Sequence, residues 1–212
     1  SWWHYDSWVG NFYPKNINKN QWLEYYSGFF DAVEVNSSFY HHIKEEVFEN
    51  WFRHTPDDFI FCIKAPRYIT HIKRLIECSE PFKKLLDSAS KLKYKLGLFL
   101  FQLPPNLKKD SERLKRFLSS IPGNYRYVFE FRDESWFNYE IYKILDLYNA
   151  AIVISDSPMF PYHEITTGGI SYIRMHGRGE LYSSKYFKED LERIACLIKK
   201  NIDSGITTHV YF

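Results

Sequence analysis

Cysteine is scarce in this chain of 212 residues: Cys62, Cys78 and Cys196 lie far apart and form no CxxC pair. An odd number of widely spaced cysteines predicts neither a disulfide framework nor a zinc site. We therefore expect a reducing, cytoplasmic environment for this protein.

Long apolar runs and an excess of one charge are also missing. The longest apolar run, LGLFLFQL at 96–103, is too short to span a bilayer, and no basic-then-apolar leader precedes the N-terminal SWWHYDSW. The 28 Lys and Arg against 26 Asp and Glu give a formal net charge of +2, far from the balance of a dedicated nucleic-acid-binding protein. These features predict a soluble protein without membrane contact. A local basic patch is still compatible with this net charge, and these features do not indicate an oligomeric state.

Apolar segments typical of strands alternate with segments typical of helices along the whole chain. The strand-like segments are AVEVN (32–36), FIFCIK (59–64), LGLFLFQL (96–103), YVFEFR (127–132), AIVISD (151–156), SYIRMH (171–176) and THVYF (208–212). Helices are expected at 19–30, 45–54, 79–95, 110–120, 137–149 and 185–204, with Asp110 or Ser111 as one N-cap and Gly205 as one terminator. Strands that are apolar almost throughout indicate a parallel sheet covered on both faces.

Two α/β architectures fit this pattern, an open doubly wound sheet and a barrel. The open sheet calls for a glycine-rich phosphate turn, and no GxGxxG or Walker-type stretch occurs. The barrel calls for polar residues at the carboxyl ends of many strands, and these are present. We therefore predict one TIM-type (β/α)8 barrel domain over residues 1–212. Its first strand is expected to precede Ser1, outside the given chain, and the final HVYF resembles an unfinished strand.

The polar residues at the strand ends define the predicted site. Side chains alternate along a strand, so Glu34 shares one face with Asn36, and Arg174 shares one face with His176. If the aliphatic faces meet the helices, the polar faces meet in the C-terminal mouth of the barrel. The mouth is then expected to hold Glu34, Asn36, Lys64, Gln102, Glu130, Arg132, Asp156, Arg174 and His176.

This set of charges allows a structural and a functional interpretation. In the structural one, paired ions plug the barrel and do no chemistry. In the functional one, Lys64, Arg132 and Arg174 hold an anion, and His176 transfers protons together with Glu130 or Asp156. Carboxylates beside cations have lowered pKa values, which makes them better bases than acids.

Two loops and several aromatic residues extend this hypothesis. KAPRYITHIKR (64–74) is either a solvated charge run or a substrate lid that contributes Arg67. HGRGELYSSKY (176–186) contains glycines that would let backbone amides approach a ligand beside Arg178. Tyr40 and Trp136 follow strands and suit stacking on a sugar or base, although packing against the barrel explains such rings equally well.

No cofactor is predicted, and a divalent metal is possible but disfavoured. Glu34, Glu130, Asp156 and His176 are ligand types on neighbouring strand ends. The cations expected in the same mouth would repel a metal ion.

Seven stretches of the sequence resemble the YecE-like proteins, a family catalogued as domain of unknown function 72. They are WVGNFYP (8–14), EVNSSFY (34–40), KAPRYITH (64–71), FQLPP (101–105), EFRDESWF (130–137), ISDSP (154–158) and YIRMHG (172–177). The resemblance implies a TIM-type barrel and no established reaction. Family members usually begin with a strand leading to a Gly-Thr-Ser-Gly-Trp-like motif, of which Ser1 to Trp3 match the tail, and continue into Asn-rich residues that are missing after Phe212.

We expect the barrel mouth to bind an anionic or hydroxyl-rich ligand, such as a phosphorylated sugar or a nucleotide-like group. Acid–base chemistry of the hydrolase or lyase type is the leading hypothesis for its activity. The alternative is a non-catalytic nucleic-acid or ligand-binding module that uses the basic 64–74 loop and the aromatic residues of the mouth.

Overall fold

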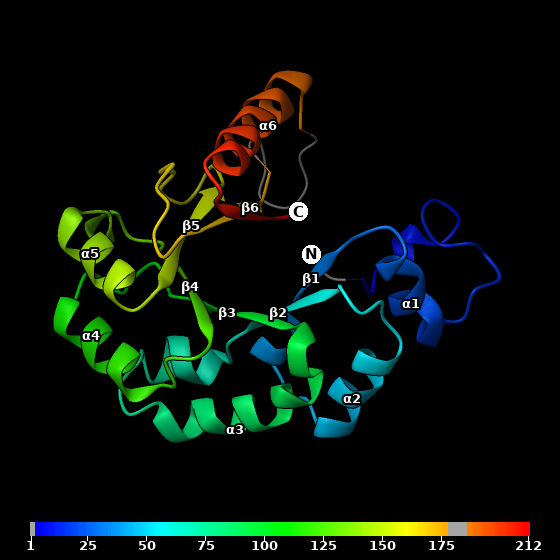
Figure 1. Ribbon diagram of the computed structural model, residues 1–212, viewed down its shortest axis with the longest axis horizontal. Helices are drawn as coiled ribbons and strands as arrows, with labels where there is room; N and C mark the ends of the chain where they lie inside the picture. The colour runs from blue at the N-terminus through cyan, green and yellow to red at the C-terminus, as the bar shows by residue number, and fades with distance from the viewer. Residues whose placement is uncertain (1–2, 178–185) are drawn as a thin grey trace.

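The fold is a seven-stranded parallel sheet that curves into a nearly closed barrel, with helices on its outer side (Figure 1). The computed structural model describes residues 3–177 and 186–212. The strands pair in chain order, so each strand lies beside the next one in the sequence. They are β1 (Ala32–Val35), β2 (Ile60–Lys64), β3 (Leu96–Gln102), β4 (Arg126–Glu130), β5 (Ala150–Asp156), β6 (Ile170–Met175) and β7 (Thr207–Tyr211).

Helices occupy the intervals in which the sequence predicted them. They are α1 (Trp22–Ser27), α2 (Glu45–Arg53), α3 (Ser79–Ala89), α4 (Ser111–Ser120), α5 (Tyr139–Leu147) and α6 (Lys188–Asp203). The predicted cap of α4 is confirmed, because the Asp110 side chain accepts a hydrogen bond of 2.9 Å from the Arg113 amide. Gly205 follows α6 with a φ of 71°, as expected of a helix-terminating glycine. Within the described residues, no helix is long and apolar enough to cross a membrane.

The α/β barrel architecture is confirmed, and side chains connect the two ends of the sheet, one formed by β1 and β2 and the other by β6 and β7. Tyr172 on β6 donates a hydrogen bond of 2.7 Å to Glu34 on β1, and Cys62 Sγ on β2 lies 2.7 Å from the Tyr211 hydroxyl on β7. No strand pairing links β1 to β7 in the described part of the chain. The eighth strand expected before Ser1 stays a prediction.

Aromatic side chains fill the layer between the sheet and the helices. Phe101 on β3 stacks on Phe129 on β4 at 5.1 Å and contacts Phe117 on α4 at 5.0 Å. The inner face carries mostly aliphatic residues, including Leu98, Leu100, Val128, Ala151 and Val153, together with Tyr172 and Tyr211. The high aromatic content of the sequence is therefore largely a property of the outer core.

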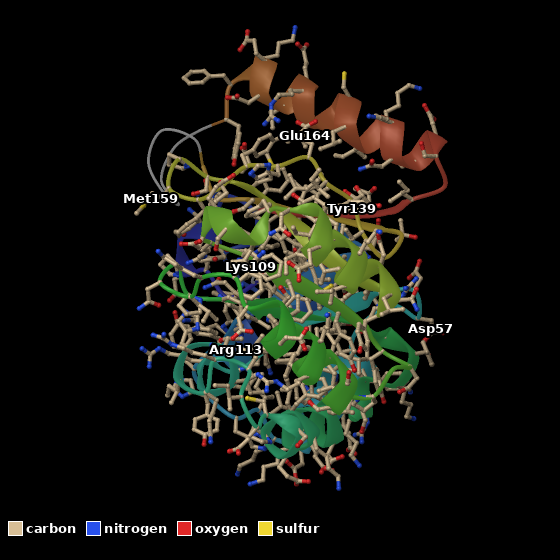
Figure 2. The ribbon with its side chains drawn as sticks, turned by 90° about the vertical axis from the view of Figure 1, so that its left-hand side faces the viewer. Asp57, Lys109, Arg113, Tyr139, Met159 and Glu164 are labelled. Carbon is tan, nitrogen blue, oxygen red and sulfur yellow. The ribbon has the colours of Figure 1, made fainter. Side chains whose placement is uncertain are left out.

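The predicted facing of β5 is wrong. Ile154 packs in the outer cluster with Ile194 on α6, and Asp156 Oδ1 lies 3.1 Å from Arg193 Nη2 on the same helix. Arg193 also pairs with Glu164, which Figure 2 shows close to α6. Asp156 therefore belongs to the contact between the sheet and α6, and Val153 represents the inner face of β5. The strand is buried on both faces, so its sequence gave little indication of its orientation.

Candidate functional site

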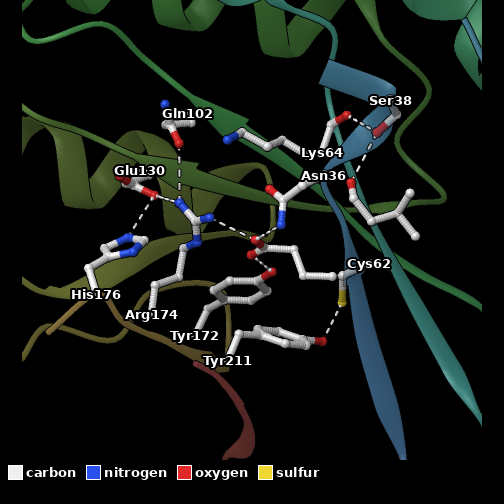
Figure 3. A network of polar contacts seen from close by, with 12 residues as sticks. Asn36, Ser38, Cys62, Lys64, Gln102, Glu130, Tyr172, Arg174, His176 and Tyr211 are labelled. Atoms are coloured by element: carbon white, nitrogen blue, oxygen red, sulfur yellow. Dashed lines mark hydrogen bonds and ion pairs between the residues drawn. The ribbon is translucent and has the colours of Figure 1, made fainter. Parts of the chain in front are cut away.

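Arg174 lies at the centre of a buried polar network in the barrel mouth (Figure 3). Its Nη2 donates to Glu34 Oε1 at 2.7 Å, and its Nη1 donates to Glu130 Oε2 and, at 3.2 Å, to Gln102 Oε1. These side chains come from β6, β1, β4 and the end of β3, so one guanidinium connects four strands. Both carboxylates are fully buried. The period-two alternation predicted this convergence.

Further donors surround the two carboxylates. Glu34 also accepts hydrogen bonds from the Tyr172 hydroxyl at 2.7 Å and from Asn36 Nδ2 at 3.1 Å. Glu130 Oε1 accepts from Arg132 Nε at 2.7 Å, and His176 Nε2 lies 3.9 Å from Glu130 Oε2. Tyr172 was not among the predicted site residues. The same alternation would have identified it, because it lies two positions before Arg174 on the strand.

These contacts keep both carboxylates ionised. Burial alone would raise the pKa of Glu34, but the Arg174 guanidinium and the Tyr172 hydrogen bond outweigh it, so the pKa is lowered. Burial opposes ionisation of Glu130 as well, and Arg174 and Arg132 hold its pKa well below the ordinary value. The same two carboxylates outweigh the effect of burial on Arg174 and raise its pKa. Glu130 is therefore unsuited to act as an acid near neutral pH.

Lys64 and Arg132 are cations whose donors are not saturated. Lys64 is 8% exposed, and its Nζ lies 4.4 Å from the centre of the Phe39 ring. No described residue provides a hydrogen-bond or ion-pair partner for this Nζ. The Arg132 guanidinium lies 3.9 Å from the centre of the Phe160 ring, and its buried Nη2 has no hydrogen-bond partner among the described residues. Both cations therefore have donors available for an anion.

The pKa of His71, in the 64–74 loop, is lowered by burial and by the cations around it. Burial is the main cause that lowers the pKa of His71 to about 4, and Arg67, Arg132 and Lys64 lower it further. His71 Nδ1 lies 2.8 Å from the Thr70 hydroxyl, within a π-helical turn at Tyr68–Ile72 that the sequence did not predict. A neutral His71 beside several cations indicates that this side of the mouth favours a negative ligand.

Tyr40 and Arg67 lie in a neighbouring cavity rather than in the buried network. The cavity has a volume of about 760 Å³ and is open to solvent. Its lining residues come from the segments after β1 and β2 and from α3, and they are Ser38, Phe39, Tyr40, His41, His42, Pro66, Arg67, Tyr68, Ile69, Ile72, Glu80, Pro81, Lys84 and Leu85. Phe39 separates the cavity from Lys64, since its ring contacts the ammonium and also lines the cavity.

The prediction that Trp136 contacts a ligand is wrong. Its side chain is fully buried, its indole N–H donates to the Leu107 carbonyl at 2.7 Å, and its ring stacks on Phe131 at 4.6 Å. A tryptophan two residues after a charged turn is as consistent with this packing as with a binding site. Arg178 and Gly179, also considered for ligand contacts, lie outside the described residues.

The donor set of the mouth suits an anion better than a metal ion. Arg174 lies between the carboxylates of Glu34 and Glu130, which a divalent cation would need to approach. In the described ranges, no group of three or more His, Cys, Asp or Glu is placed to hold a metal. Cys62 is no better placed for nucleophilic chemistry, because burial raises the pKa of its thiol to about 12.

Comparisons with known proteins place the chain in a family. The profile of the family described as "Protein of unknown function DUF72" matches residues 1–212. UPF0759 protein YecE of Escherichia coli K12 is 35% identical over 116 residues, which cover 54% of this chain and 43% of that protein. UPF0759 protein YunF of Bacillus subtilis 168 is 30% identical over 139 residues, which cover 62% and 49%. The chain spans about half the length of these relatives in the matches.

Solved structures agree with the fold. A DUF72 family protein of Thermotoga maritima superposes with a TM-score of 0.85 at 28% identity, over 100% of this chain and 89% of that one. A DUF72 family protein of Enterococcus faecalis V583 gives a TM-score of 0.78 at 20% identity, over 90% and 85%, which supports the fold alone. Because the family profile covers every residue, the chain belongs to the DUF72 family of YecE-like proteins of unknown function, as its motifs predicted.

Proposed function

We propose that the mouth of the barrel binds a small anionic ligand through Arg132 and the positive field around Lys64. The supporting observation is that the buried Arg132 Nη2 has no hydrogen-bond partner among the described residues, while Lys64, on the same side of the mouth, places its ammonium against the Phe39 ring. A buried polar group without a partner costs free energy, and a ligand oxygen would remove that cost. Binding sites of barrel enzymes lie at this end of the strands.

The charge balance of the network supports the same proposal. Lys64, Arg132 and Arg174 contribute three positive charges against two from Glu34 and Glu130, which leaves 3 − 2 = +1. Asp156 does not compensate this charge, because it pairs with Arg193 on α6. A purely structural plug would be expected to balance its own charges. The surplus therefore favours a site that a ligand anion completes.

A phosphorylated sugar or a nucleotide-like group fits this donor set. A phosphate could accept two hydrogen bonds from a guanidinium, and the amides of Gln102 and Asn36 suit hydroxyl groups. In hydrolase- or lyase-type chemistry, His176 would move the proton. Glu130, kept ionised, would orient His176 rather than exchange protons itself.

Calorimetric titration of the chain with inorganic phosphate and with a sugar phosphate tests the proposal. We expect saturable binding that weakens at least about tenfold in Arg132→Gln, since one charge-assisted hydrogen bond contributes more than 1 kcal/mol. Arg126→Gln is the matched control: Arg126 lies at the opposite end of β4, where it is exposed, so affinity should not change. Circular dichroism verifies that both variants fold. Equal affinity in wild type and Arg132→Gln, or no saturable binding, would contradict the proposal.

Nucleic-acid binding is the second candidate, and the open cavity beside the mouth supports it. Tyr40 and Tyr68 are 71% and 46% exposed there, next to the exposed Arg67. Exposed rings beside a cation suit stacking on unpaired bases. Binding to single-stranded oligonucleotides should then weaken steeply with salt and with Arg67→Gln together with Tyr40→Ala, and should not depend on Arg132. Weak binding without salt dependence would exclude this candidate.

A further inference from the structure

We propose that Lys64 is a nucleophilic amine that forms an imine with an aldehyde or ketone group of the anionic ligand. This inference rests on the proposed function, from which it takes the negative charge of the ligand. It adds that the ligand also carries a carbonyl group. Reactive lysines of this kind are desolvated and lie beside other cations. The surroundings of Lys64 meet both conditions.

The position of Lys64 fits attack on a bound ligand. It is the last residue of β2, at the carboxyl end of the strand, and its side chain extends into the mouth (Figure 3). The Phe39 ring covers one side of the ammonium at 4.4 Å. The backbone is fixed, because the Ser38 hydroxyl donates to the Lys64 carbonyl at 2.6 Å. A fixed backbone and an amine without a hydrogen-bond partner in residues 3–177 and 186–212 let Nζ approach a carbonyl carbon.

The charges that face Lys64 favour loss of its proton. Burial is the main cause that lowers the pKa of Lys64 to about 8, and Arg174 lowers it further. Glu34 and Glu130 act in the opposite direction, but both are hydrogen-bonded to Arg174. Arg132 disfavours the ammonium as well, and His71 on the adjoining loop adds no charge near neutral pH. A substantial fraction of the amine is therefore neutral and nucleophilic in mildly alkaline solution.

Lys95 shows what a buried structural lysine looks like in the same protein. It is 1% exposed, and its Nζ donates to the carbonyls of Phe52 and Thr55 at 2.7 Å each and to the Thr55 hydroxyl at 3.3 Å. Burial lowers its pKa too. Three acceptors occupy its three protons, so its lone pair is not available. Lys64 is buried as well, and no residue in the described part of the chain offers its Nζ such an acceptor.

The proposed step is balanced without an oxidant or reductant. The Lys64 ammonium gives one proton to water, and the amine lone pair forms a C–N bond to the carbonyl carbon. The carbonyl oxygen takes up a proton and becomes the hydroxyl of a carbinolamine. The nitrogen then releases a second proton, with which the hydroxyl leaves as water while the nitrogen lone pair forms the C=N bond. The products are a protonated imine and one water molecule.

Pyridoxal 5′-phosphate, which carries an aldehyde and a phosphate, is a suitable probe. The 212-residue chain is treated with it at about pH 7.5, the imine is reduced with borohydride, and labelled lysines are mapped by mass spectrometry. We expect Lys64 to be labelled at least about tenfold faster than exposed lysines such as Lys44 and Lys83. Lys95 should remain unlabelled. Inorganic phosphate should slow the labelling of Lys64.

The comparison with pyridoxal, which lacks the phosphate, separates the two proposals. Fast labelling of Lys64 by both probes at equal rates supports the nucleophilic amine and contradicts anion binding. Labelling of Lys64 no faster than that of Lys44, while phosphate still binds in calorimetry, overturns the amine and leaves anion binding intact. The test needs no variant, so it does not depend on whether Lys64→Met folds.

Discussion

A single residue, Arg174, links the four strands that form the mouth. Its positive charge compensates the negative charges of Glu34 and Glu130, which are both fully buried. Arg174 itself is only 6% exposed. Removing one partner from a buried ion pair costs more than the pair contributes, because the remaining charge has no compensation. The residue therefore controls stability, and its bonds to two buried carboxylates make it a poorer ligand contact than Arg132.

We predict that Arg174→Gln lowers the free energy of unfolding by about 3–5 kcal/mol in urea denaturation. Arg53→Gln is the control, because Arg53 forms an exposed pair with Glu49 at 3.2 Å, and its loss should cost less than about 1 kcal/mol. Similar small losses in both variants would show that the network is not the strong compensated cluster described above.

We predict that Lys64 makes the free energy of unfolding depend on pH. Its pKa is lowered from 10.5 to about 8 in the folded state, so the unfolded chain binds more protons between these values. The free energy of unfolding therefore rises with pH through this window. Relative to Lys64→Met, wild type should gain about 2 kcal/mol from about pH 7 to about pH 10, measured by urea unfolding of both proteins. A difference that stays constant with pH would contradict the buried, unpaired ammonium.

The site could be predicted only where the sequence itself marks which face is polar. Glu34 with Asn36, and Arg174 with His176, alternate with apolar residues, so their common direction follows from the strand period. Asp156 ends a strand that is apolar on both faces, and its partner Arg193 is 37 positions away. Its direction depends on the packing of α6, which no local pattern encodes.

At the scale of elements, the connection between β5 and β6 depends on two adjacent glycines. Gly168 and Gly169 have φ values of 59° and 69°, a conformation that residues with a side chain adopt only with strain. They differ in their surroundings: a Cβ on Gly168 would lie 2.6 Å from the Ala150 carbonyl oxygen, whereas a Cβ on Gly169 would meet no atom within 4 Å.

We predict that Gly169→Ala lowers the free energy of unfolding by about 1 kcal/mol and Gly168→Ala by at least twice as much. The first value reflects backbone strain alone, and the second adds a clash with a backbone that cannot move without disturbing β5. Urea denaturation of the two variants measures the difference. Equal losses would indicate that the turn adapts to a side chain at either position.

The elements themselves were largely predictable. All seven strands and six helices lie where apolar periodicity, caps and glycines placed them. The π-helical turn at Tyr68–Ile72 was missed, because it depends on the burial of Ile69 and Thr70 and not on a local signal.

At the scale of the whole molecule, β5 joins two parts of the sheet. Its residues 150–152 pair with β4, and its residues 153–156 pair with β6. The second part, with β6, β7 and α6, extends away from the other helices in Figure 1. Side chains across the mouth connect the parts again, through Arg174 with Glu34 and Tyr172 with Glu34. We expect these contacts to make the chain one cooperative unit.

Unfolding probes can test this coupling, since all six tryptophans lie within residues 2–136 and report on the first part alone. Tryptophan fluorescence and far-ultraviolet circular dichroism, which also includes α6, should follow the same urea transition. A dichroism transition in two steps, with only one of them matched by fluorescence, would show that the second part unfolds independently.

A crystal structure of the chain soaked in phosphate would show whether the barrel mouth binds an anion. We predict a phosphate ion within hydrogen-bond distance of Arg132 Nη2, with Arg174 still bound to Glu34 and Glu130. A mouth that holds only water, while phosphate binds elsewhere on the surface, would contradict it and would favour a barrel closed by its own ion pairs.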